Sequence, residues 1–88
     1  MKEYQVYYKG LYIGRLIINE DGQYIYYLND HFKTSCFFSD HPLREVLTSE
    51  QTEFGPPIEF FSKIIFNLQL LGDLYSCEEE GVRLRRIG

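Results

Sequence analysis

The stretch 12–28, YIGRLIINEDGQYIYYL, predicts a β-hairpin whose two faces are both apolar. Its segments rich in Ile, Leu and Tyr flank Asp21-Gly22, a dipeptide typical of a two-residue type I′ turn. A hairpin in a small domain ordinarily packs one face on the core and leaves the other in water. Two apolar faces require two covers, and this requirement constrains the fold more than any other feature of the chain.

A three-stranded antiparallel meander is predicted over residues 3–9, 11–19 and 23–28, with the first turn at Lys9-Gly10. The two turns fix a register in which Val6 lies opposite Ile13 and Ile18 lies opposite Ile25. One face then carries Tyr4, Val6, Tyr8, Leu11, Ile13, Ile17, Tyr24, Tyr26 and Leu28. The second face carries Tyr7, Tyr12, Leu16, Ile18, Ile25 and Tyr27.

Two helices and a last strand follow the meander. Apolar side chains at helical spacing after Pro56-Pro57 predict the main α-helix over 57–71, and Gly72 is a plausible stop. Asp40 as N-cap and Pro42 in the first turn predict a short helix over 42–48, after an irregular segment. The ending VRLRRI predicts a C-terminal strand.

These elements predict an α+β fold in one domain, residues 1–88. The antiparallel three-stranded meander plus the C-terminal strand packs against the main α-helix (57–71) and the short helix (42–48). A chain of 88 residues has no room for a second core.

The second face of the meander is the predicted contact surface. The main helix covers one face only, and the short helix offers little apolar surface. Either residues 29–55 fold over the second face, or another protein or a second copy covers it. Aromatic residues make up 17% of the chain, which favours an interface. We therefore expect partner-binding residues at Tyr7, Tyr12, Leu16, Ile18, Ile25 and Tyr27.

Other kinds of chemistry find little support in the sequence. The net charge of −4 argues against direct nucleic-acid binding, although tyrosines on a sheet face can stack on bases. His31, Cys36, His41 and Cys77 match no zinc-site spacing, and no glycine-rich phosphate loop is present. We expect no metal and no cofactor. The weakest alternative is a thiol-dependent enzyme that uses Cys36 with His41, because no flanking motif supports that pair.

The expected location is the cytoplasm. The start MKEYQVYYKG lacks the apolar region of a signal peptide, and no apolar run reaches the roughly 20 residues that cross a bilayer. We therefore expect reduced thiols and no membrane partner.

The order of elements resembles the small N-terminal domain of HipA-type serine/threonine kinases, the toxins of some bacterial toxin–antitoxin pairs. The likeness rests on short motifs: Ile13-Gly14-Arg15-Leu16, the turn Asp21-Gly22 before QYIYYL, the helix residues Phe60, Phe61, Ile64 and Ile65, and the ending with Leu70, Leu71, Gly81 and Val82. No kinase domain follows in this sequence, so no catalytic residue is carried over. The resemblance implies a free-standing domain that binds a separate kinase or its DNA-binding partner.

Together these features predict a non-enzymatic protein–protein interaction domain, a regulatory or antitoxin-like partner of a HipA-like kinase. The alternative is a homodimer that pairs through the same face or through a strand edge.

Overall fold

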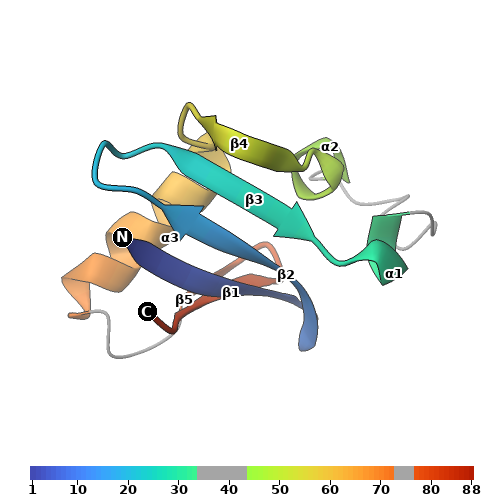
Figure 1. Ribbon diagram of the computed structural model, residues 1–88. Helices are drawn as coiled ribbons and strands as arrows, with labels where there is room; N and C mark the ends of the chain where they lie inside the picture. The colour runs from blue at the N-terminus through green and yellow to red at the C-terminus, as the bar shows by residue number, and fades with distance from the viewer. Residues whose placement is uncertain (34–43, 73–76) are drawn as a thin grey trace.

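The computed structural model describes residues 1–33, 44–72 and 77–88 of the chain. The described strands form one antiparallel six-stranded sheet in the order β4-β3-β2-β1-β6-β5 (Figure 1). The strands are β1 (Lys2–Tyr8), β2 (Leu11–Ile18), β3 (Tyr24–Leu28), β4 (Gln51–Gly55), β5 (Cys77–Glu79) and β6 (Val82–Arg86). The predicted meander forms the middle of the sheet, and the C-terminal strand pairs with β1 as its other neighbour.

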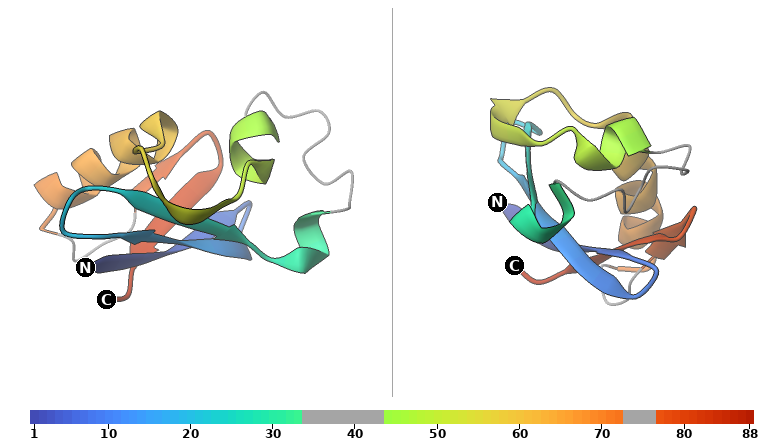
Figure 2. Two further views of the ribbon diagram at one scale, coloured as in Figure 1. Left: turned by 45° about the horizontal axis from the view of Figure 1, so that its top comes forward. Right: turned by 90° about the vertical axis from the view of Figure 1, so that its right-hand side faces the viewer.

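The main helix, α3 (Glu59–Leu70), lies across one face of this sheet (Figures 1 and 2). It buries Phe61, Ile64, Ile65 and Leu68 against the sheet. The short helix α2 (Arg44–Thr48) stands on the same side, with Leu47 in the core, and α1 (Asp30–Lys33) follows the end of β3. The fold therefore has two layers, and one face of the sheet is the core face.

The core face is apolar from strand to strand. Its buried strand residues are Tyr4, Val6, Tyr8, Ile13, Leu16, Tyr24, Tyr26, Leu28, Val82 and Leu84. The ring of Tyr26 packs on Phe61 with centroids 5.0 Å apart, and the Tyr24 hydroxyl hydrogen-bonds Ser62 Oγ at 2.8 Å. The Tyr24 hydroxyl, carried into this layer, thus has a hydrogen-bond partner on the helix.

The predicted two-residue turn at Asp21-Gly22 is wrong by one residue. The Asn19 backbone N–H donates to the Gln23 carbonyl, and the Asn19 carbonyl accepts from the Gly22 N–H. The Asn19 Oδ1 accepts from the backbone N–H groups of Asp21 and Gln23. Gly22 alone takes a positive φ, +78°, so the loop is a three-residue type I turn with a glycine bulge. The asparagine side chain favours this turn over a type I′ turn, which would force Asp21 into positive φ.

That one-residue difference exchanges the two faces of most of β2. Leu16 pairs with Tyr26 and Ile18 with Tyr24, so both turn toward the core face, whereas Ile17 pairs with Ile25 on the other face. A bulge in β2 opposite Val6 and Tyr7 restores the predicted orientation beyond it, because Val6 pairs with Gly14 and Tyr7 with Tyr12. The extra residue, Ile13, stays fully buried as predicted.

The prediction of one strand beyond the meander understates the sheet. β4 was expected to be a break and β5 was not expected, because QTEFG and CEE lack the alternating apolar pattern that marks a strand. The main helix begins at Glu59 rather than residue 57 and ends at Leu70. The described part of the short helix begins at Arg44, and its predicted start at Asp40 and Pro42 lies outside the described residues.

Candidate functional site: the open face of the sheet

The face of the sheet opposite α3 is the candidate site, and we call it the open face. Strand register places its side chains in three cross-strand rows. The rows are Ile25–Ile17–Glu3, Tyr27–Arg15–Gln5–Arg85 and Tyr12–Tyr7–Arg83–Glu78. Aliphatic, arginine–tyrosine and aromatic groups therefore stand side by side on one surface.

Arginines and tyrosines hold each other in place on the open face. The Arg83 guanidinium lies 4.8 Å from the centre of the Tyr7 ring, and that of Arg15 lies 5.0 Å from the centre of Tyr27. Tyr7 also meets Tyr12 edge to face at 5.7 Å. Such contacts fix the rings and guanidinium planes at separations typical of cation–π and T-shaped aromatic pairs.

Polar neighbours complete the order of this surface. The Tyr7 hydroxyl donates to Gln5 Oε1 at 2.9 Å, and Arg15 Nη1 lies 4.0 Å from Glu3 Oε2. Ile25 is only 8% exposed although it is not part of the core cluster, so its neighbours on the open face cover it. The open face is therefore a preorganised layer of side chains rather than a set of independent surface groups.

The structure brings four of the six predicted contact residues together. Tyr7, Tyr12, Ile25 and Tyr27 all lie on the open face, and Tyr12 is 38% exposed. The placement of Leu16 and Ile18 on this face was wrong. Leu16 is fully buried in the core, and Ile18 packs against the core, because the β2–β3 loop is one residue longer than predicted.

Sequence reasoning missed four members of the open face: Arg15, Ile17, Arg83 and Arg85. The two C-terminal arginines alternate with the buried Val82 and Leu84, and this alternation was a usable signal for their face. What the sequence did not show is that β6 pairs with β1, which places Arg83 beside Tyr7.

The described part of residues 29–55 does not cover the open face. β4 extends the sheet beside β3, and α2 lies on the core side, where the Tyr26 hydroxyl donates to the Leu47 carbonyl at 2.7 Å (Figure 2). Residues 34–43 lie outside the described part.

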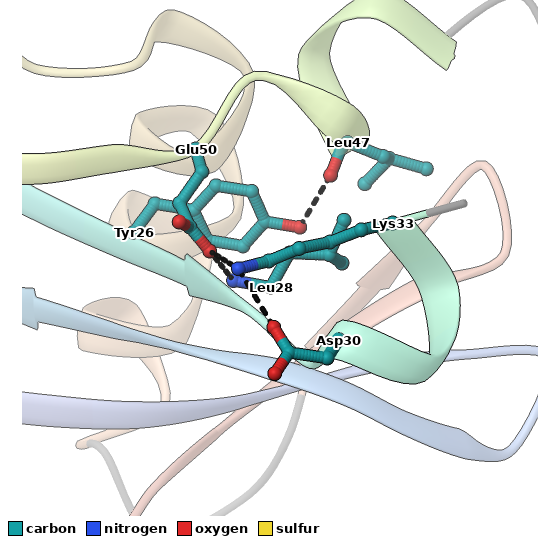
Figure 3. Close-up of polar contacts among 6 residues, drawn as sticks. All are labelled: Tyr26, Leu28, Asp30, Lys33, Leu47 and Glu50. Carbon is teal, nitrogen blue, oxygen red and sulfur yellow. Dashed lines mark hydrogen bonds and ion pairs between the residues drawn. The ribbon is translucent and has the colours of Figure 1, made fainter.

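A polar cluster beside the core links β3 to α1 and to the segment before β4 (Figure 3). Glu50 Oε2 accepts from the Leu28 backbone N–H at 2.8 Å and from Lys33 Nζ at 3.2 Å, and Lys33 also meets Asp30 at 2.9 Å. Hydrogen bonds to Asp30 and then Glu50 raise the pKa of Lys33. Each charge in the cluster faces an opposite charge. Glu50 also satisfies the Leu28 N–H of β3, which lies past the last residue of β3 that pairs with β4. The cluster therefore has a structural role.

A cleft of about 600 Å³ opens between α3 and the β2–β3 loop, on the core side of the sheet. Its lining includes Lys2, Ile18, Tyr24, Ser62 and Phe66. Among the described residues, the Ser62 hydroxyl hydrogen-bonds the Tyr24 hydroxyl and donates to the Ile58 carbonyl, and neither group is a general base. The serine in this cleft is therefore not arranged as an activated nucleophile.

Three other kinds of site were considered from the sequence: a metal site, a thiol pair and a membrane-spanning helix. Within residues 1–33, 44–72 and 77–88, no three His, Cys, Asp or Glu side chains are grouped to hold a metal ion. Cys36 and His41 lie outside these ranges, so the predicted thiol pair is not described. Among the described helices, none has the length and apolar character that crossing a bilayer requires.

No protein-family model, curated protein or solved structure matches the chain. The open face is the site that its geometry singles out.

Proposed function

We propose that this chain is a non-enzymatic interaction domain that binds a second protein through the open face. The observation that carries the proposal is the ordered set of tyrosines and arginines on a sheet face that no described helix covers. Tyr and Arg dominate the binding energy of many protein interfaces, because they combine large contact areas with directional polar groups.

Preorganisation strengthens this proposal. Binding costs free energy when mobile side chains become fixed, and stacking has already restricted Arg15 and Arg83 on their tyrosines. Ile17 lies two residues from Arg15 on β2, opposite the covered Ile25, and adds a partly exposed aliphatic group. A partner would therefore meet a surface whose geometry changes little on binding.

The strand edges are less suited to pairing than the face. β5 has three residues and carries Glu78 and Glu79, while β4 contains Glu53 and runs into Pro56. Short edge strands, charges and nearby prolines are features that discourage edge-to-edge addition of another strand. The open face is thus the better surface for a partner.

The partner class comes from the resemblance to HipA-type N-terminal domains. A domain of that kind would act as a regulatory or antitoxin-like partner of a HipA-like kinase. Its contact residues on this chain would be Tyr7, Tyr12 and Tyr27, with Ile25 beside Tyr27 on β3. This partner assignment rests on short sequence motifs, and the contact residues rest on the geometry of the open face.

Paired surface variants test the proposal. Tyr12→Ser removes an exposed aromatic from the open face, while Phe66→Ser removes one that is 62% exposed on α3, on the other side of the sheet. Each tagged variant is used to capture proteins from the native cell extract and to bind a purified HipA-type kinase. We expect the captured partner to survive Phe66→Ser and to be lost with Tyr12→Ser; the opposite pattern would move the interface to α3.

Self-association is the second candidate, since a second copy could cover the same face. Light scattering across a concentration series measures it directly against the 10.5 kDa mass of one chain. We expect a monomer. A dimer that Tyr12→Glu dissociates would instead assign the open face to a homodimer.

A further inference from the structure

We propose that the open face recognises an acidic, extended segment of its partner protein, with carboxylates set against Arg15, Arg83 and Arg85. The inference rests on the proposed function and adds the chemistry of the partner. The face carries these three arginines against two glutamates, Glu3 and Glu78, so its net charge is +1 in a chain whose total charge is −4. The charge of the open face thus has the opposite sign to that of the whole chain.

The three guanidinium groups surround the middle of β1. Arg15 and Arg85 flank Gln5 from the two neighbouring strands, and Arg83 lies two residues before Arg85 on β6. Residues two apart on a strand are about 6.6 Å apart along it. Alternate residues of an extended acidic segment have the same spacing, so consecutive carboxylates on one side of it can meet Arg83 and Arg85.

Arg83 has an unused donor. Its Nε–H is buried, and no acceptor within the described residues reaches it. The same side chain is stacked on Tyr7, which orients the guanidinium plane. Within the described part of the chain, no carboxylate forms an ion pair with Arg83 or Arg85. Because the Nε–H itself is buried, a carboxylate from a partner would accept from the terminal N–H groups of Arg83 and Arg85, through charge-assisted hydrogen bonds.

The two glutamates favour a protein segment over a nucleic acid. Glu3 and Glu78 lie at the two sides of the arginine cluster, where a continuous phosphate backbone would pass close to them. A peptide can place carboxylates opposite the arginines and neutral or basic residues opposite the glutamates, so charge pattern as well as charge sign is matched.

An NMR titration of the isotope-labelled chain tests this inference with three probes. The first is a synthetic peptide that alternates Glu with Thr, the second replaces each Glu by Gln, and the third is single-stranded oligothymidylate. We expect the Glu peptide to shift amide signals of β1, β2 and β6 and to bind more tightly than the other two probes. Arg85→Gln should weaken binding of the Glu peptide about tenfold, which is the effect expected from the loss of one charged hydrogen bond.

Arg44→Gln is the matched control. Arg44 is exposed on α2, so this substitution removes the same charge from a site away from the open face. Arg44→Gln should leave the affinity for the Glu peptide within about twofold, because salt largely screens an exposed charge that lies outside the binding surface. Equal binding of the Glu and Gln peptides, no binding by the Glu peptide, tighter binding by the oligonucleotide, or equal effects of the two arginine variants would each overturn the inference. The capture experiment with Tyr12→Ser would still stand, so the two proposals fail separately.

Discussion

The two faces of the same sheet differ in how their side chains are packed and exposed. On the core face, adjacent strands present tyrosines and aliphatic residues that are almost entirely removed from water by α3 and α2. On the open face, tyrosines of the same strands pack on arginines and keep part of their surface exposed. Burial of apolar area therefore stabilises the fold through one face, and the other retains groups suited to recognition.

The largest expected difference between the faces comes from adjacent residues of β2. Ile13 is fully buried, and Tyr12 is exposed on the open face. Ile13→Glu should unfold the domain, because an unpaired buried carboxylate costs several kcal/mol of a stability that is typically about 5–15 kcal/mol. Tyr12→Glu should stay folded by circular dichroism and lose partner binding. Unfolding by both changes would show that both faces are internal.

A second pair of substitutions tests the register of β2 itself. Leu16→Ala should lower the free energy of unfolding by about 3 kcal/mol, since Leu16 is fully buried and its truncation leaves a cavity. Ile17 pairs with Ile25 on the open face, and Ile17→Ala should cost about 1 kcal/mol. Urea denaturation measures both values. A larger loss for Ile17→Ala would favour the register with a two-residue turn.

Gly14 tests how closely β2 approaches β3. A Cβ atom at this position would lie 2.1 Å from the Tyr27 carbonyl oxygen, so Gly14→Ala must push two paired strands apart. We expect a loss of about 2–3 kcal/mol in denaturant unfolding. Gly55→Ala in the edge strand is the control, because its new Cβ would meet the movable Gln51 side chain, and it should cost less than about 1 kcal/mol. Equal losses would contradict the close approach.

The Tyr26 hydroxyl gives a pH-dependent effect of smaller size. Burial, and then the charge of Glu50, raise the pKa of Tyr26 far above its ordinary value of 10.0. In the unfolded chain this phenol loses its proton near pH 10, while the folded chain keeps it, so stability should fall as the pH rises above that value. Tyr26→Phe should cost about 1–2 kcal/mol at neutral pH, where the Leu47 carbonyl loses its donor.

Denaturation of the wild type and of Tyr26→Phe from pH 8 to pH 11 measures this effect. The gap between the two proteins should narrow toward high pH, because only the wild type carries the phenol that must stay protonated. A constant gap across that range would mean that Tyr26 ionises equally in both states.

The features predicted from sequence are those set by strong local signals. Alternating Tyr and Val residues gave β1, the Lys9-Gly10 turn gave the first hairpin, and apolar spacing gave the main helix within a few residues of its ends. The register of the second hairpin could not be predicted, because Asn19 and Gly22 form a longer loop that competes with the expected type I′ turn. β5 could not be predicted, since a strand that consists of CEE is defined by its pairing with β6.

The open face was predicted in part for the same reason. Tyr7, Ile25 and Tyr27 could be assigned to it because β1 and β3 alternate regularly. Tyr12 could be assigned because the Lys9-Gly10 turn places it opposite Tyr7. Arg15 could not, because the β2–β3 loop is one residue longer than predicted. The place of Arg83 and Arg85 beside Tyr7 and Gln5 could not, because it depends on long-range pairing of β6 with β1. Strand order is a tertiary property, and a single sequence carries only a weak local signal for it.

Hydrogen exchange of the domain, free and bound to its captured partner, tests most directly whether the open face is the binding surface. Comparison of the two states by mass spectrometry maps the backbone amides that the partner protects. We predict added protection in β1, β2 and β6, with α3 unchanged. Protection confined to α3 and to the cleft beside the β2–β3 loop would contradict the assignment of the open face as the interaction surface.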